Sequence, residues 1–169
     1  MQYWNKYTDY MKRNLFWMFL LAAVLTMGIV SCSDPEEGES WDTWVMRNQL
    51  NSLWSLDYIK VNGEYRRLGD DGFDFYLTMK LKADGRKFET ERFFYKEAEG
   101  IVDESTRVKK TGTYTIDASS KTIELIDSEG KKFMRLSNIE FGTGSMSATV
   151  LFYDLNKTYD IGLDRTASF

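Results

Sequence analysis

The chain has 169 residues, with 22 basic and 26 acidic side chains, and a formal net charge of −4 at pH 7. This length suits one domain with its own core, and the acidic balance argues against a nucleic-acid partner. The sequence contains no histidine, which removes the usual general base and the usual metal ligand, so we expect no enzyme, no cofactor and no metal site.

Residues 1–31 have the order of a secretory signal. Lys12 and Arg13 form a short positive region, and Leu15–Val30 is an apolar run. The run is shorter than the roughly 20 residues that a membrane-spanning helix needs. We therefore predict that residues 1–31 are a signal peptide. Met11 suits the start of such a signal better than the first methionine, so it is a candidate for the true start of the protein.

The signal ends at the only cysteine of the chain. The stretch Ile29-Val30-Ser31-Cys32 resembles the lipobox of bacterial lipoproteins. The resemblance implies cleavage between Ser31 and Cys32 and a lipid anchor on Cys32, with acyl chains such as palmitate. One acyl chain binds a membrane only marginally, whereas two or three anchor a protein stably. The alternatives are an ordinary signal peptide with an incidental cysteine and an uncleaved membrane anchor.

Residues 32–40 are expected to form an acidic tether behind the lipidated cysteine. The stretch Ser33-Asp34-Pro35-Glu36-Glu37 resembles the export signal of surface lipoproteins in some gram-negative bacteria. The same composition is typical of a solvated linker, and the two interpretations are compatible. We expect a lipid-anchored protein of the outer membrane, either on its inner leaflet or on its outer leaflet at the cell surface.

Residues 41–169 are expected to form one domain that begins with a short helix. Ser40 is placed to cap a helix of about two or three turns that ends near Asn51. Trp41 and Trp44 recur at helical spacing. They are expected to pack on the domain, with stacking on a sugar as the alternative.

After Leu53 the apolar period changes to two, and short polar turns separate the runs. In the first run, Trp54, Leu56 and Tyr58 are expected to share one face. We interpret Glu64–Leu68 as a short strand or a loop, and the charged Lys96–Lys110 as a loop. Strands are expected at Leu53–Val61, Phe73–Lys82, Lys87–Tyr95, Thr111–Asp117, Thr122–Ile126, Lys131–Phe141, Ser145–Tyr153 and Thr158–Arg165.

This pattern predicts an all-β fold, because no helical segment is long enough for a parallel crossover. Neighbouring strands should pair as an antiparallel meander. Eight strands suit an up-and-down barrel with a short N-terminal helix, since closure removes exposed edges and can leave space for one small ligand.

Several segments resemble the bacterial lipocalin-like lipoproteins. These are Leu53–Leu56 with its tryptophan, Ala83-Asp84-Gly85, and Gly112–Asp117 followed by Thr122–Leu125. The resemblance covers roughly Leu53 to the end of the chain. It implies a calycin-type barrel and small apolar ligands, and it implies no catalytic residues.

The predicted barrel suggests two alternative functions. The first is binding of a small apolar or amphipathic molecule in the barrel mouth. The second is a non-catalytic accessory role in an envelope complex, in which a filled barrel presents loops such as Lys96–Lys110 to a protein partner. The candidate lining residues, which could equally fill the core, are Trp54, Tyr58, Phe75, Phe94 and Tyr114.

Two arginines and one acidic cluster complete the candidates. Arg92 and Arg135 lie in apolar strands, where an inward arginine could bind a ligand carboxylate through two hydrogen bonds. We favour either an outward charge on the strand or a side chain whose stem extends over aromatic rings. Asp70, Asp71 and Asp74 are interpreted as an acidic turn, because their spacing does not match a calcium-binding EF-hand loop.

Overall fold

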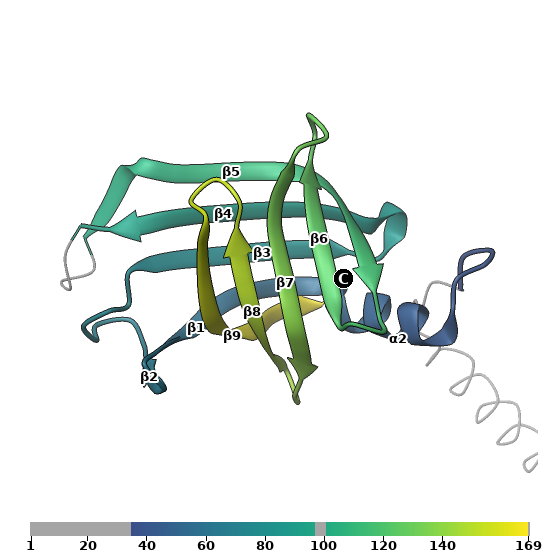
Figure 1. The fold of residues 1–169 in the computed structure, drawn as a ribbon, viewed down its shortest axis with the longest axis horizontal. Coiled ribbons are helices and arrows are strands. Elements are labelled where there is room, and N and C mark those ends of the chain that lie inside the picture. The colour runs from purple at the N-terminus through teal and green to yellow at the C-terminus, as the bar shows by residue number, and fades with distance from the viewer. Residues whose placement is uncertain (1–34, 97–100, 169) are drawn as a thin grey trace, which may run out of the picture. The chain divides into compact units, whose positions relative to one another are not determined.

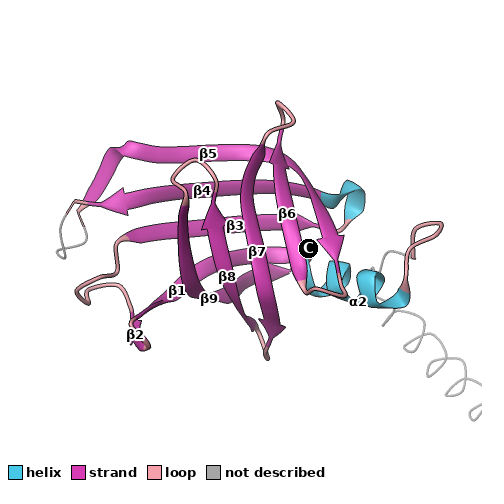
Figure 2. Ribbon diagram, viewed as in Figure 1, coloured by secondary structure: helices cyan, strands magenta, loops and turns pink. Residues whose placement is uncertain are grey.

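The structure is a computed structural model that describes residues 35–96 and 101–168. The signal peptide, the cleavage position at Ser31 and the lipidation of Cys32 concern residues outside this described part, so they stay predictions. Figures 1 and 2 show a short helix followed by a sheet of antiparallel strands. The elements are α2 (Trp41–Leu50), β1 (Ser52–Val61), β2 (Glu64–Arg66), β3 (Phe75–Lys82), the 3-10 turn η1 (Asp84–Arg86), β4 (Lys87–Tyr95), β5 (Val102–Asp117), β6 (Thr122–Asp127), β7 (Lys132–Phe141), β8 (Ser145–Phe152) and β9 (Lys157–Ser168).

Eight of these strands close into a barrel. The order runs β1-β3-β4-β5-β6-β7-β8-β9, and β9 returns to pair with β1. The closing pairs run from Ser52 opposite Ser168 to Lys60 opposite Asp160. The short β2 is an addition that pairs with the last residues of β1. The predicted all-β, antiparallel, eight-stranded meander barrel with a short helix is thereby confirmed.

The helix lies at one end of the barrel, which we call the helix end. There β1 begins and β5 ends, and the turns after β5 and β7 lie at the same end (Figure 1). The predicted cap is confirmed, because the Ser40 Oγ accepts a hydrogen bond from the Thr43 N–H at 3.2 Å. The opposite end, with β2 and the β8–β9 turn, is the far end.

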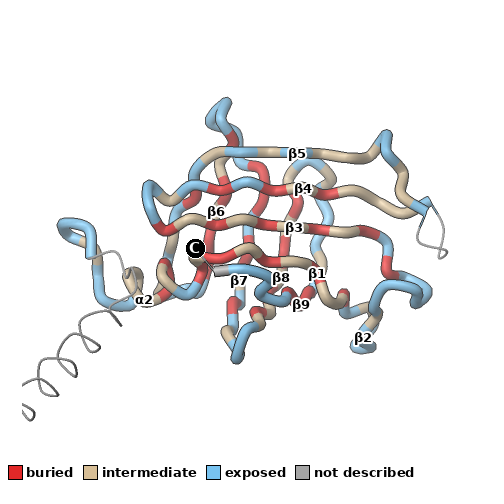
Figure 3. Tube along the Cα trace, turned by 180° about the vertical axis from the view of Figure 1, so that it is seen from behind, coloured by how far each residue is buried: buried red, intermediate tan, exposed pale blue. Residues whose placement is uncertain are grey.

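Alternate residues of the strands fill the interior. In β3, every second side chain from Phe75 to Leu81 is buried, and those between are half-buried. β8 repeats the pattern from Met146 to Phe152, and Figure 3 shows this alternation along the trace. The inward side chains form one hydrophobic cluster. Period-two patterning therefore places one face of each strand in a shared core.

A β-bulge interrupts this alternation in β1. Trp54 and Leu56 point inward, but the register with β9 shifts between Leu56 and Tyr58, and Ile59 becomes the next fully buried residue. The prediction that Trp54, Leu56 and Tyr58 share one face is therefore wrong at Tyr58. The extra residue of a bulge turns the following side chains to the opposite face of the strand.

The charged segment Lys96–Lys110 is largely a strand and not a loop. β5 starts at Val102 and pairs with β4, so residues 102–110 of the predicted loop belong to a strand. Its charges lie on the solvent face and pair across the strands. Arg107 binds Glu91, and the Lys109 Nζ lies 3.4 Å from a Glu91 carboxylate oxygen. Because these charges pair across the strands, a strand can contain as many charged residues as a solvent-exposed loop.

Buried ion pairs close the helix end. Glu39, just before α2, has a side chain that is 1% exposed. Its carboxylate accepts hydrogen bonds from the Arg47 Nε at 3.0 Å, from the Arg47 Nη2 at 2.8 Å and from the Arg86 Nη2 at 3.2 Å. Burial alone would raise the pKa of Glu39, but the hydrogen bonds and positive charges hold this pKa below its usual range.

This arrangement predicts that acid weakens the fold. A carboxylate whose pKa is lowered by folding stabilises the protein above its unfolded pKa, and that contribution is lost as the pH falls through the folded pKa. We expect the free energy of unfolding, measured with urea, to fall between about pH 5 and about pH 2. Glu39→Gln should flatten this dependence, whereas Glu37→Gln, at an exposed position, should not. Identical pH dependence in all three proteins would contradict the assignment.

Candidate functional site

Four of the five predicted ligand-binding residues belong to the interior. Trp54, Phe75 and Tyr114 are at most 1% exposed and lie in the core cluster, and Phe94 packs against it. Tyr58 does not join them. Its ring lies on the outer face and packs edge-on against Tyr65, with ring centroids 4.8 Å apart.

The polar tips of these interior aromatics are already bound by the chain itself. The Trp54 indole N–H donates to the Leu50 carbonyl oxygen at 2.9 Å. The Tyr114 hydroxyl donates to the Lys82 carbonyl oxygen at 3.0 Å. Both donors are thus satisfied by the backbone at the helix end. These two side chains act as core residues that fix the helix end to the barrel.

Arg92 lies inside the barrel near the far end, with a side chain 2% exposed. Its Nη1 and Nη2 donate to the two carboxylate oxygens of Asp154 at 3.0 and 2.6 Å. Its guanidinium carbon lies 4.6 Å from the ring centroid of Phe152. The outward placement of Arg92 is therefore wrong, whereas Arg135 is exposed as predicted. A carboxylate of the chain itself, on the β8–β9 turn, takes the position that we considered for a ligand.

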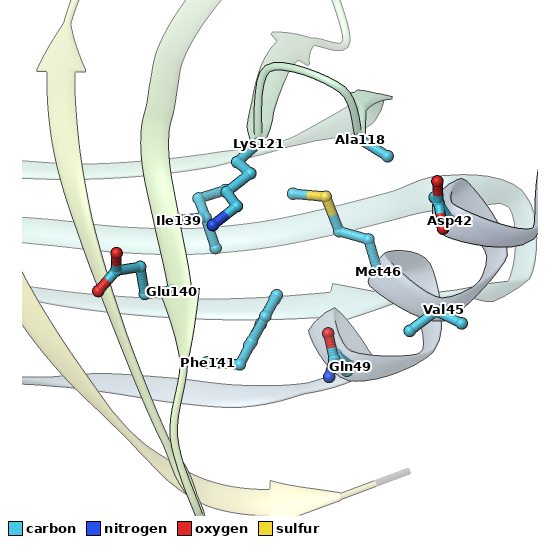
Figure 4. Close-up of a pocket in the computed structure, with 9 residues that line it drawn as sticks. All are labelled: Asp42, Val45, Met46, Gln49, Ala118, Lys121, Ile139, Glu140 and Phe141. Carbon is cyan, nitrogen blue, oxygen red and sulfur yellow. The ribbon is translucent and has the colours of Figure 1, made fainter.

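A hollow lies at the helix end. It has a volume of about 520 Å³ and separates α2 from the rim of the barrel (Figure 4). The helix supplies one side, the β5–β6 turn a second and the end of β7 a third. The lining residues are Asp42, Val45, Met46, Gln49, Ala118, Lys121, Ile139, Glu140 and Phe141.

The hollow has an apolar base and a charged rim. Met46 reaches from α2 toward Ile139 on β7, and both side chains are almost fully buried (Figure 4). Phe141 extends the apolar surface. The Lys121 ammonium forms no ion pair with any described residue, and the Asp42 carboxylate lies across the hollow on α2 (Figure 4). An apolar base with separate charges at its rim suits a molecule that has both apolar and polar parts.

Sequence reasoning placed the ligand in the barrel mouth, but it expected interior aromatic residues as the lining and did not name the residues of this hollow. Its lining comes from three segments that are distant along the chain, and their meeting depends on how α2 docks. Lys121 closes a five-residue turn with a left-handed φ of 49°, a conformation that the sequence does not reveal. Lysine rarely adopts a left-handed backbone conformation by itself, so the surrounding structure stabilises this one.

Trp41 lies beside this site on the outer side of α2. It is 65% exposed and stacks on Trp44, with ring centroids 4.5 Å apart. The prediction that Trp41 packs on the domain is wrong, because its neighbour on the helix takes up the contact. Exposed aromatic surface of this kind is typical of an interaction site.

The acidic loop before β3 forms a turn. The Asp70 carboxylate accepts a hydrogen bond from the Arg67 N–H at 2.8 Å. Within residues 35–96 and 101–168, no group of three or more acidic, cysteine or histidine side chains is arranged to hold a metal ion. Nor does this part of the chain contain a helix of the length and apolarity needed to cross a membrane.

Comparison with models of known protein families, with curated proteins and with solved structures found no match to this chain.

Proposed function

We propose that this protein is a lipid-anchored envelope lipoprotein with a lipocalin-like barrel, which binds a small amphipathic molecule at the helix end. The hollow between α2 and the barrel rim carries the proposal. Its volume of about 520 Å³ lies in the range of roughly 300–1,000 Å³ that is common for small-ligand pockets. The likeness of Ile29–Cys32 to a lipobox supports the anchor, and with it an outer-membrane location.

The chemistry of the lining supports an amphipathic ligand. Val45, Met46 and Phe141 offer apolar contacts to the ligand body. Lys121 and Asp42 offer one positive and one negative charge to its polar group. The mouth of the barrel thus remains the proposed place of binding. The ligand lies above the core residues and not among them.

The second candidate is a non-catalytic accessory role in an outer-membrane or surface complex. Two observations favour it. Trp54, Phe75 and Tyr114 fill the interior, and Trp41 presents an aromatic surface beside the stacked Trp44. A filled barrel with an exposed aromatic patch suits protein recognition.

Native mass spectrometry of the full chain, purified from its own host, tests the choice. We expect a small molecule to copurify and to be lost on denaturation. Ala118→Trp should abolish copurification by filling the hollow, and Lys121→Asn should reduce it while accepting the left-handed backbone. Ala167→Trp, at an exposed position outside the hollow, is the matched control. A bare wild-type chain would contradict small-molecule binding and favour the accessory role.

A further inference from the structure

A second hollowed region crosses the outer face of β7, β8, β9 and β1. It consists of two adjoining hollows of about 440 and 370 Å³, which share Tyr58, Glu140 and Ser147. We call it the outer groove. Its described lining includes the charged and aromatic side chains of Asp57, Tyr58, Lys60, Tyr65, Glu140 and Asp164.

One row of paired residues forms the centre of the outer groove. Glu140 is opposite Ser147, Ser147 is opposite Gly162, and Gly162 is opposite Tyr58. The two middle residues are small: the Tyr58 ring lies over Gly162, and Ser147 leaves the floor of the groove low between this ring and the Glu140 side chain. Four neighbouring strands therefore build one trough from a carboxylate to an aromatic ring.

Two backbone features hold the Tyr58 ring in this trough. The bulge in β1 turns Tyr58 to the outer face, as described above. Gly162 then gives the ring room, because a Cβ at position 162 would lie 2.0 Å from the Tyr58 Cε1 atom. Any other residue at 162 would push the ring away. Bulges are often found where a side chain is directed to a functional site.

The outer groove carries an excess of negative charge. Its described lining contains four carboxylates, those of Asp57, Glu140, Asp160 and Asp164, and a single cation, Lys60. The Asp57 carboxylate is paired with Arg67 at 3.2 Å, and Asp160 accepts a hydrogen bond from Thr149 at 2.7 Å. By contrast, Glu140 and Asp164 form no ion pair with any described residue.

The aromatic side of the groove already contacts a cation of the chain. The Lys60 Nζ lies 5.5 Å from the ring centroid of Tyr65, which is 63% exposed. This distance is typical of a cation–π contact. A tyrosine pair beside unpaired carboxylates offers an organic cation both a ring face and a counter-charge.

We propose that the outer groove binds an organic cation, with its ammonium or guanidinium group between the tyrosine pair and the carboxylates of Glu140 and Asp164. The proposal goes beyond the amphipathic site at the helix end and does not depend on it. The cation belongs either to a free polyamine or to a lysine or arginine of a peptide, because both present the same charged group.

Isothermal titration calorimetry on the full chain in detergent micelles tests the proposal, with spermidine and a tri-arginine peptide as probes at low salt. We expect Glu140→Gln and Asp164→Asn each to weaken binding about threefold, the size of one exposed charge interaction. Gly162→Ala should weaken binding about tenfold or more, since it displaces the ring. Tyr58→Leu removes the ring directly and serves if Gly162→Ala lowers stability. Glu89→Gln, an exposed carboxylate outside the groove, should leave binding unchanged.

The two probes distinguish the sources of the cation. Binding of both probes supports a general site for organic cations, and binding of the peptide alone assigns the cation to a polypeptide. Binding should weaken as salt rises from about 0.02 to 0.5 M, because ions screen exposed charges. No binding of either probe at millimolar concentration would overturn the proposal. If Glu89→Gln and Asp164→Asn weakened binding equally, the proposal would also be overturned, because the probes would then be attracted non-specifically to an acidic protein.

Discussion

Trp54→Ala is expected to lower the free energy of unfolding by about 4 kcal/mol. Trp54 is fully buried in the core, and its indole N–H binds the Leu50 carbonyl oxygen at the end of α2. Truncation to alanine leaves a large cavity and removes this hydrogen bond. The Arg165 guanidinium, whose central carbon lies 5.0 Å from the Trp54 ring, loses its aromatic partner as well. Urea unfolding followed by circular dichroism measures the loss.

Two further variants separate the contribution of apolar burial from that of the hydrogen bond. Trp54→Phe keeps most of the apolar volume but leaves the Leu50 carbonyl oxygen without its donor, so we expect a loss of about 1–2 kcal/mol. Trp41→Ala, at a position 65% exposed, should change stability by no more than about 1 kcal/mol. An equal loss at Trp41 and Trp54 would contradict the core position of Trp54.

Asp154→Ala is expected to lower the free energy of unfolding by about 3 kcal/mol. This change leaves the buried guanidinium of Arg92 without the carboxylate that binds both of its terminal nitrogens. Arg92→Met should cost less, about 1 kcal/mol, because it removes the buried charge and fills a similar volume among the rings of Phe94, Phe133 and Phe152.

The test is whether Asp154→Ala lowers the free energy of unfolding more than Arg92→Met does, and urea unfolding measures both changes. Adding Arg92→Met to Asp154→Ala should restore part of the lost stability, because the unpaired charge is then gone. Lys131→Ala, which removes an exposed ion pair with Glu129, should change stability by less than about 1 kcal/mol. A larger loss for Arg92→Met than for Asp154→Ala would show that the pair itself stabilises the barrel.

Much of the fold could be predicted because its local signals agree. The period-two pattern from Phe75 to Leu81 places one face in the core, and β3 follows it. β4 has the predicted bounds, Lys87–Tyr95, since a turn precedes it and a charged segment follows. Ser40 caps α2 as expected, because the interaction that forms an N-cap is local to the sequence.

The missed features depend on contacts between distant segments. The bulge before Tyr58 adjusts β1 to its pairing with β9, more than a hundred residues later, and leaves no mark in the local pattern. Arg92 could not be placed because its partner, Asp154, looks like an ordinary turn residue. Charge alone marked residues 102–110 as a loop, although a strand with one solvated face tolerates the same charges when its neighbour supplies the opposite ones.

The closure of the barrel by β1 and β9 has a consequence for how the chain folds. The Ser55 Oγ and the Thr166 Oγ1 lie 3.0 Å apart across this seam, although 111 residues separate them in sequence. Such a high contact order makes folding slow, with millisecond-to-second times typical of this class of topology. Until the last 12-residue strand arrives, β1 and β8 each present an open edge. A chain shortened at its C-terminus should therefore aggregate edge to edge and not fold into a smaller barrel.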